Sequence, residues 1–400
     1  MFDRRTVRRV VAAWSAVLVV AAAAAAATAQ PAGAARGLLK GIYDDTQTLY
    51  GNPDQTYATL KNLRTKVVRI NMYWGGEYGA ANRRPARPTD PADSAYDWGL
   101  YDRAVRYAEA FDMEVVFSIW GTPGWANRFR GLRYAPVAPR DLQNFAYAAA
   151  KRYSGTYEVT EEVEDADGNT VEVPVNLPRV RFWAAWNEPN NPAFLFPQYR
   201  LVKGKPALWS PRDYARICNA VRAGVKLTLI RADKVACGVT APRGNNNPRT
   251  LRPSVSPLPF LRGMKRYGAR GFDAYAHHPY YGSKKETPTT KPPKRSNAIT
   301  LGNINDLTKE LTRLYGRSVR LWLTEYGYQT RPDRAFAVTL PQQARYMSQA
   351  FAIAKKNPRI DMLVWFMLRD DRNLALGWQS GLLTAGGSRK PAFTTFRAIS

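Results

Sequence analysis

Short apolar runs alternate with longer amphipathic segments along residues 37–400, and this alternation is the main structural signal in the sequence. Eight runs are rich in β-branched and aromatic residues and have the length of strands. They are Gly37–Tyr43, Lys66–Tyr73, Met113–Trp120, Arg179–Trp186, Lys234–Thr240, Phe272–His278, Ser318–Thr324 and Asp361–Leu368. Runs such as Met362–Met367 are apolar at every position, which is typical of strands covered by helices on both faces of a parallel sheet.

Between these runs, apolar residues recur at spacings of three and four, which predicts amphipathic helices. The clearest examples are Tyr101–Phe111, Tyr214–Val225 and Ala344–Ala354, and Ser210-Pro211 and Leu340-Pro341 are typical helix starts. Eight strand–helix units over this length predict a single α/β domain, a (β/α)8 TIM barrel. An open doubly wound sheet is the alternative, but it normally carries a glycine-rich nucleotide-binding turn that this sequence lacks.

Two insertions interrupt the regular alternation. Tyr157–Val175 alternates polar and β-branched residues around Asp167-Gly168-Asn169, which predicts a β-hairpin on the bottom or side of the barrel. Ser283–Asn297 is rich in Lys, Pro and Thr and follows the sixth predicted strand, so we expect a long loop on the catalytic face. No repeat or second module is visible, and the predicted catalytic domain fills residues 37–400.

The first 29 residues have the pattern of a signal peptide. An arginine-rich head precedes the apolar, alanine-rich segment Val10–Ala27, and Ala27-Thr28-Ala29 is a small-x-small cleavage site. A membrane anchor is the alternative, disfavoured because the segment is short and is followed by Pro31 and Gly33. Two arginine pairs suggest export by the twin-arginine route, although the residues that flank them match the pattern of such signals poorly. We therefore expect residues 30–36 to be a short linker and the mature protein to be secreted, extracellular or cell-wall associated, with no membrane attachment.

The chain is strongly basic and contains two cysteines. Cleavage after residue 29 removes four Arg and one Asp, which lowers the net charge from +27 to +24. Such a charge attracts polyanions nonspecifically, and a bias toward Arg in the whole proteome would produce the same count of basic residues. The sequence has no nucleic-acid-binding motif, so we expect no specific nucleic-acid partner. Cys218 and Cys237 form either one disulfide or two buried thiols, and their spacing does not fit a zinc site.

Two glutamates directly follow predicted strands. Glu188 lies in Trp186–Pro189 after the fourth strand, and Glu325 lies in Leu323–Gly327 after the seventh. Catalytic groups of a TIM barrel occupy the C-terminal ends of its strands. Hydrolysis of a glycosidic bond needs a pair of carboxyl groups, one protonated and one ionised. Each glutamate alone fits an ordinary solvated loop residue, but the two positions together indicate a catalytic pair.

These motifs resemble those of clan A glycoside hydrolases. The resemblance rests on Asn187-Glu188-Pro189 and on Glu325 at the end of strand seven, and it extends over nearly all of residues 37–400. Gly121–Trp125 after strand three, and the closing segments Trp378–Leu382 and Lys390–Ala392, are similar to families 5 and 39. The resemblance implies that Glu188 is the acid/base, that Glu325 is the nucleophile and that the anomeric configuration is retained.

Further site residues follow from position and from the resemblance. Arg69 ends the second strand, where it could hydrogen-bond Glu325 and keep it ionised, or could pair with a structural carboxylate. The resemblance assigns the sugar 2-hydroxyl to Asn187 and a hydrogen bond to the nucleophile to the tyrosine of His278-Pro279-Tyr280. The neighbouring His277 leaves that alignment ambiguous by one residue.

Tryptophans supply the candidate sugar platform. The resemblance places Trp365, near the end of strand eight, under the sugar at the cleavage point. Trp74, Trp120 and Trp125 could extend this platform or belong to the core. No carboxylate cluster flanks the two histidines of the sequence, so we expect neither a metal nor another cofactor.

The sequence therefore predicts a secreted, monomeric, retaining β-glycosidase that cleaves a polysaccharide or oligosaccharide. The alternative is a catalytically inactive carbohydrate-binding or cell-surface barrel, which would be expected to lose at least one glutamate. Two loops after the fifth and sixth strands are basic, and their charge suggests an anionic substrate or cell wall as a hypothesis. The alternative for these side chains is simple solvation. The basic side chains of the two loops are Arg243, Arg249, Arg252, Lys284, Lys285, Lys291, Lys294 and Arg295.

Overall fold

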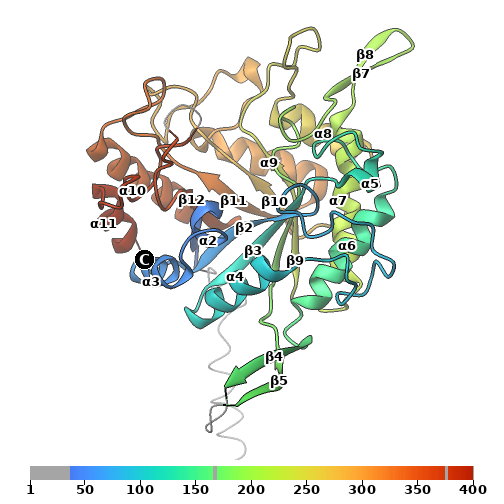
Figure 1. The fold of residues 1–400 in the computed structure, drawn as a ribbon. Helices are drawn as coiled ribbons and strands as arrows, with labels where there is room; N and C mark the ends of the chain where they lie inside the picture. Colours follow the sequence, from blue (N-terminus) through green and yellow to red (C-terminus); the bar gives the residue numbers. More distant parts are fainter. Residues whose placement is uncertain (1–36, 165–168, 374–376, 400) are drawn as a thin grey trace, which may run out of the picture. The chain divides into compact units, whose positions relative to one another are not determined.

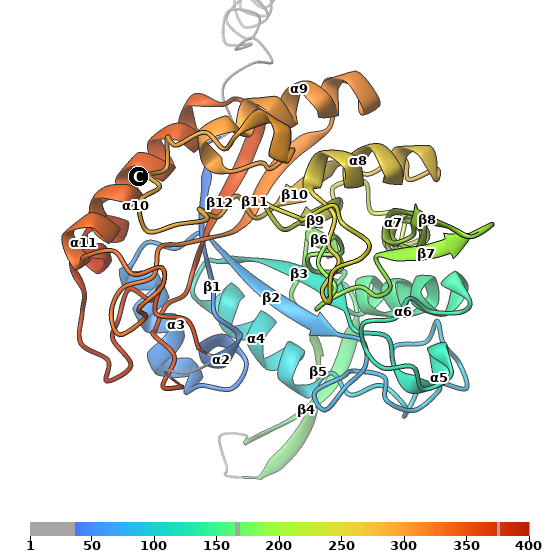
Figure 2. The ribbon, with the colours of Figure 1, turned by 90° about the horizontal axis from the view of Figure 1, so that it is seen from above.

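Eight parallel strands close into a barrel in the computed structural model, which describes residues 37–164, 169–373 and 377–399 (Figure 2). In barrel order they are β1 (Leu39–Tyr43), β2 (Val67–Tyr73), β3 (Glu114–Trp120), β6 (Phe182–Ala185), β9 (Lys234–Thr240), β10 (Ala274–His277), β11 (Arg320–Tyr326) and β12 (Ile360–Phe366). β12 pairs in parallel with β1 and closes the ring. Each strand overlaps one of the eight predicted runs.

A helix follows every barrel strand and packs outside the ring (Figure 1). The eight helices are α3 (Pro53–Asn62), α4 (Gly99–Ala110), α6 (Pro139–Arg152), α7 (Ser210–Lys226), α8 (Pro257–Arg266), α9 (Ile304–Tyr315), α10 (Leu340–Lys356) and α11 (Pro391–Ala398). The short helices are α2 (Asp45–Thr48), α5 (Gly124–Asn127), η1 (Lys294–Ser296) and η2 (Leu301–Asn303). α7 and α10 begin at the predicted Ser-Pro and Leu-Pro pairs, and the predicted (β/α)8 barrel is confirmed.

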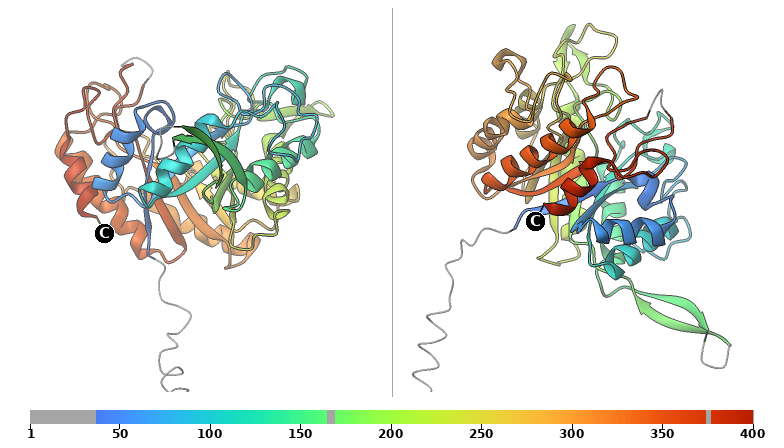
Figure 3. Two further views of the ribbon diagram at one scale, coloured as in Figure 1. Left: turned by 60° about the horizontal axis from the view of Figure 1, so that its bottom comes forward. Right: turned by 90° about the vertical axis from the view of Figure 1, so that its left-hand side faces the viewer.

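Two antiparallel hairpins extend from opposite ends of the barrel (Figure 1). The predicted insertion forms β4 (Glu158–Glu164) and β5 (Thr170–Asn176), while residues 165–168 of its expected turn lie outside the described residues. Figure 3 shows this hairpin projecting away from the helices. A second hairpin, β7 (Tyr199–Val202) with β8 (Lys205–Leu208), was not predicted, because strands of four partly exposed residues leave no clear period.

Apolar residues form two separate layers of the barrel. A small inner cluster includes Met362 and Val364, and the large outer cluster between strands and helices includes Leu363 and Trp365. This alternation follows from the period of two in a strand. It decides which side chains of each strand can reach the interior and its C-terminal end.

A disulfide joins Cys218 of α7 to Cys237 of β9, which decides between the two alternatives left open by the sequence. The predicted signal peptide (1–29) and the linker (30–36) lie outside the described residues. Among the residues that the structure describes, no helix has both the length and the apolar character needed to cross a bilayer.

Candidate active site

Arg69 organises the centre of the C-terminal end of the barrel. The prediction that Arg69 ends the second strand is wrong, because it lies near the start of β2, two residues after the inward-facing Val67, where it is fully buried. Its Nη1 donates to Oε2 of Glu325 at 2.8 Å, and its Nη2 donates to Oδ1 of Asn187 at 2.6 Å. The Tyr43 ring lies 4.3 Å from the guanidinium carbon. The predicted contact between Arg69 and Glu325 is therefore present in the structure.

A local irregularity of β11 directs Glu325 toward the interior. Leu323 pairs with Leu363 of β12 and Tyr326 pairs with Trp365, so β11 contains one extra residue at this point. Such a bulge changes the face to which a side chain points. The other carboxylate oxygen, Oε1, accepts a hydrogen bond from the Tyr280 hydroxyl at 3.0 Å, as the sequence motif implied.

Glu188 reaches the same space from the loop after β6. Trp186 and Glu188 have positive φ angles of 76° and 37°, which are uncommon for residues other than glycine and often occur at functional sites. Oε2 of Glu188 accepts from Nδ2 of Asn191 at 3.1 Å. Burial raises the pKa of Glu188, and the Asn191 hydrogen bond and the charge of Arg69 oppose this increase.

His278 connects the two glutamates. Its Nδ1 lies 3.0 Å from Oε1 of Glu188 and 3.4 Å from Oε2 of Glu325. Its Nε2 lies 3.2 Å from Nη1 of Arg69, which can only donate. Nδ1 therefore faces carboxylate acceptors and Nε2 faces a donor. This arrangement fits the neutral tautomer of His278 that carries its proton on Nδ1. Burial lowers the pKa of His278 to about 3, so the ring is neutral near pH 7.

His277 has a different role from its neighbour. Its Nδ1 lies 2.8 Å from Oγ1 of Thr240, and its Nε2 lies 3.0 Å from the carbonyl oxygen of Ile299. It is fully buried and bonds away from the carboxylate pair. The one-residue ambiguity of the sequence motif is thus decided in favour of His278.

The two carboxyl groups are close together. One ligand atom from each of Glu188, His278 and Glu325 lies within 4.8 Å of the others, which is also a possible set of metal ligands. However, Arg69 already places a positive charge 2.8 Å from Glu325, and His278 already hydrogen-bonds Glu188. The same atoms thus form a hydrogen-bonded group with Arg69.

Trp365 does not lie with the other predicted site residues. It is fully buried in the outer layer, and its indole nitrogen donates to the carbonyl oxygen of Ser380 at 2.9 Å. The next residue, Phe366, instead stacks on Tyr43 at a centroid distance of 5.1 Å. The exposed ring of Trp378 lies 5.5 Å from Phe366, so Phe366 and Trp378 form the aromatic wall beside the site.

The three tryptophans left undecided by the sequence have different environments. Trp74 is fully buried against Trp125 and Phe145 and belongs to the core. Trp120, at the C-terminal end of β3, and Trp125 both remain partly accessible. Only these two could therefore extend an aromatic surface.

Four residues of this region were missed from the sequence: Asp45, Asn191, Phe366 and Trp378. Asp45 accepts from the backbone nitrogen of Asn71 at 3.1 Å, and the hydroxyls of Tyr43 and Tyr73 each lie 3.4 Å from its Oδ2. Burial raises its pKa to about 6. It lies two residues after the end of β1, so the strand-end rule that found the glutamates could also have found it.

Comparisons with known proteins identify relatives by structure only. No protein-family model matches the sequence, and no curated protein matches it. A family 39 glycoside hydrolase from Bacteroides cellulosilyticus WH2 is similar with a TM-score of 0.59 and 17% identity, over 90% of this chain and 63% of that chain. A glucosidase from Croceicoccus marinus has a TM-score of 0.61 and 15% identity, over 92% of this chain and 68% of the other.

A family 5 subfamily 18 protein from Streptomyces cattleya, whose structure contains Manβ1-4GlcNAc, is also similar. The TM-score is 0.56 and the identity 14%, over 90% of this chain and 79% of that chain. This chain spans less than two thirds of the first of the three proteins and a larger share of the other two. The predicted resemblance to families 5 and 39 is confirmed at the level of structure, and the chain has the (β/α)8 fold of these glycoside hydrolases.

Proposed function

We propose that this protein is a retaining β-glycosidase with Glu188 as acid/base and Glu325 as nucleophile. The observation that carries the proposal is the separation of the two carboxyl groups: one oxygen of Glu188 and one oxygen of Glu325 lie within 4.8 Å of each other. Retaining enzymes separate these groups by about 5–5.5 Å, whereas inverting enzymes leave about 6.5–9.5 Å for a water molecule. The short separation supports double displacement.

The surroundings of the two glutamates support different protonation states. Burial raises the pKa of Glu188, which favours the protonated form that a general acid needs. Glu325 accepts hydrogen bonds from the Arg69 guanidinium at 2.8 Å and from the Tyr280 hydroxyl, and both donors hold it in place as the proposed nucleophile. Because His278 is neutral, the charges of Arg69 and Glu325 balance within the site.

Each step then balances in atoms and charge. The Glu325 carboxylate bonds to the anomeric carbon while the bond to the leaving oxygen breaks and Glu188 gives that oxygen its proton. A water molecule next adds its hydroxyl to the anomeric carbon, Glu188 takes the remaining proton, and Glu325 leaves as a carboxylate. Two inversions at the same carbon retain its configuration.

Neighbouring side chains are placed to hold the sugar. Oδ1 of Asn187 is used by Arg69, which leaves its amide N–H groups free to donate to the sugar 2-hydroxyl. Phe366 and Trp378 offer apolar faces to sugar C–H groups. Asp45 Oδ1 accepts from the backbone nitrogen of Asn71 and has one lone pair left for a sugar hydroxyl.

We also propose that the protein is exported. The pattern of residues 1–29 supports cleavage of a signal peptide, and the disulfide fits an oxidising compartment. N-terminal sequencing of protein from the culture medium tests this, and an intact Met1 on cell-bound protein would contradict it.

The catalytic test is sugar release from a panel of plant, fungal and bacterial-wall polysaccharides. Wild type is compared with Glu188→Gln and Glu325→Gln, and Glu109→Gln on the exposed surface of α4 is the matched control. We expect release by wild type and the control only, with NMR showing the β-anomer as the first product. Folded, sugar-binding protein that releases nothing would favour the inactive scaffold, and an α-anomer would contradict retention.

A further inference from the structure

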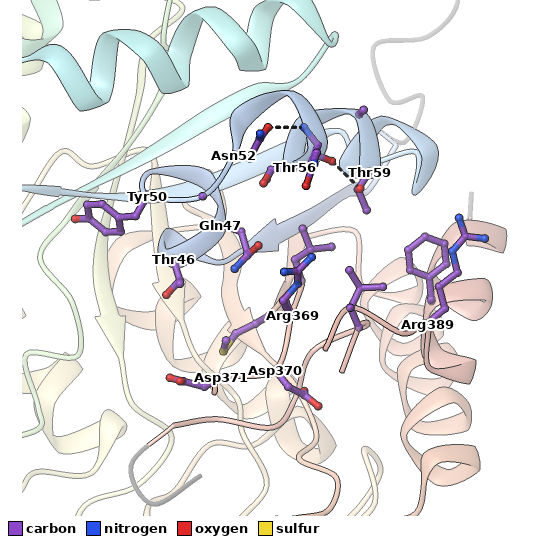
Figure 4. Close-up of a pocket in the computed structure, with 18 of the residues that line it drawn as sticks. Thr46, Gln47, Tyr50, Asn52, Thr56, Thr59, Arg369, Asp370, Asp371 and Arg389 are labelled. Atoms are coloured by element: carbon purple, nitrogen blue, oxygen red, sulfur yellow. Dashed lines mark hydrogen bonds between the residues drawn. The ribbon is translucent and has the colours of Figure 1, made fainter. Parts of the chain in front are cut away.

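A pocket of about 1010 Å³ lies outside the proposed catalytic pair. One side consists of α2 and α3, and the other consists of the segment after β12 and the start of α11 (Figure 4). Neither Glu188 nor Glu325 lines it. The volume is at the upper end for small-molecule sites.

Three arginines line this pocket without ionic partners. Arg369, Arg372 and Arg389 have no carboxylate within ion-pair distance in the part of the chain that the structure describes. The Nε of Arg369 is buried and has no hydrogen-bond acceptor. Arg389 lies over the ring of Phe393 at 4.6 Å, which supports its position.

The acidic residues of the pocket do not cancel this charge. Asp370 is buried and already paired with Lys390 at 2.6 Å. Asp371 is the other acidic side chain among the lining residues. Three guanidinium groups against one uncompensated carboxylate leave a local excess of positive charge, which favours an anionic ligand.

The opposite wall has the chemistry of a carbohydrate site. Gln47, Asn52 and Thr59 present amide and hydroxyl groups from the α2–α3 side (Figure 4). Oδ1 of Asn52 caps α3 by accepting from the Gln55 nitrogen, so its N–H groups stay available. Tyr50 is 40% exposed at one end, and its ring can stack on a sugar.

The pocket adjoins the catalytic site along both walls. Thr46 lines the pocket and directly follows Asp45, and Met367 lines it and directly follows Phe366. The two segments are joined because Oδ2 of Asp44 accepts from the backbone nitrogens of Leu368 and Arg369, each at 3.1 Å. A polymer chain that leaves the site over the segments that follow β1 and β12 therefore meets the arginines next.

We propose that this arginine pocket binds an acidic segment of the substrate chain, so that the substrate is an anionic polysaccharide. The inference rests on the proposed glycosidase function and extends it by naming the substrate class. It also places the binding of the acidic substrate groups in the arginine pocket and not in the two basic loops. Of the eight basic side chains in those loops, Arg243 is already paired with Glu286 at 2.8 Å.

The test measures binding and not catalysis. Full-length Glu325→Gln protein is titrated by calorimetry with three hexasaccharides that share one galactan-type backbone. The first carries carboxylates, the second carries sulfates and the third is uncharged. The pocket variant adds Arg372→Ala and Arg389→Ala, both at exposed positions. The matched control adds Arg266→Ala and Arg270→Ala, which remove the same charge from exposed positions at the end of α8 and in the segment after it.

We expect a charged hexasaccharide to bind more tightly than the neutral one, and its affinity to fall about tenfold in the pocket variant only. A preference for carboxylate over sulfate, or the reverse, identifies the acidic group. Equal losses in the pocket and control variants, or equal binding of the neutral sugar, would overturn the proposal. If the Glu325→Gln protein binds a charged hexasaccharide as expected but the wild type releases no sugar from any substrate, the glycosidase function would be contradicted instead.

Discussion

The replacement Asn191→Ala isolates one contact of the proposed acid. Nδ2 of Asn191 donates to Oε2 of Glu188 at 3.1 Å, and this bond stabilises the ionised carboxyl against the effect of burial. Removing the donor leaves burial as the dominant influence, so the pKa of Glu188 rises further. Because the acid must be protonated to release the leaving group, the basic limb of the pH profile should move to higher pH.

The size of this shift follows from the strength of one charged hydrogen bond. Such a bond contributes about 1.5–3 kcal/mol when fully buried. The Glu188 side chain is 14% exposed, so water can replace part of the lost interaction. We therefore expect a free-energy change at the lower end of this range. Since 1.36 kcal/mol corresponds to one pKa unit, we expect a shift of about one unit.

The assay is kcat/KM against pH for two substrates of the same sugar. An alkyl glycoside needs proton donation and should show the shifted limb, whereas a dinitrophenyl glycoside leaves without a proton and should show little basic limb. Asn247→Ala is the matched control, because both asparagines also accept from the backbone nitrogen two residues ahead. An unchanged or lowered basic limb for the alkyl glycoside would refute the reasoning.

Three further changes address stability and rate. Arg69→Met should lower the free energy of unfolding by about 3–5 kcal/mol in urea titrations, because it leaves the Glu325 charge unpaired in the interior. Tyr280→Phe should lower kcat/KM about 10- to 100-fold by removing one hydrogen bond to Glu325, the proposed nucleophile. The pair Cys218→Ala and Cys237→Ala opens a bridge between residues 19 apart and should cost about 3 kcal/mol of unfolding free energy.

Each of these changes has a matched comparison. Arg313→Met removes a surface ion pair and should alter stability by about 0.5 kcal/mol or less, and an equal loss at both arginines would contradict the buried-pair argument. Tyr107→Phe removes an exposed tyrosine hydroxyl and should leave the rate unchanged. Reduction of the wild type should match the double alanine variant, and unchanged stability in both would contradict the disulfide prediction.

The fold could be predicted because strand and helix periods differ clearly in this sequence. All eight barrel strands and the β4–β5 hairpin overlap predicted runs. The β7–β8 hairpin could not be found, since its strands have four residues each and bury little apolar surface. Short elements of this kind depend on tertiary contacts that a local pattern does not encode.

The strand-end rule located the carboxylates but could not orient every neighbour. Met362–Met367 is apolar throughout, so nothing in the pattern says whether Trp365 or Phe366 faces the interior. A shift of one residue along the strand moves a side chain to the opposite face of the sheet. In the structure Phe366 faces the site and Trp365 faces the outer layer. Trp378 enters from a loop after β12, where no period exists to place it.

The net positive charge of the chain is largely irrelevant to the reacting carboxylates. Arg69 offsets Glu325 at 2.8 Å, and the raised pKa of Glu188 and the lowered pKa of His278 favour neutral forms of both. Buried pairs of this kind are screened little by salt, whereas the exposed arginines of the pocket are screened strongly. Ionic strength should therefore act on substrate association and leave the bond-breaking step nearly unchanged. This division of charge allows a basic protein to attract a polyanion without disturbing its proposed acid.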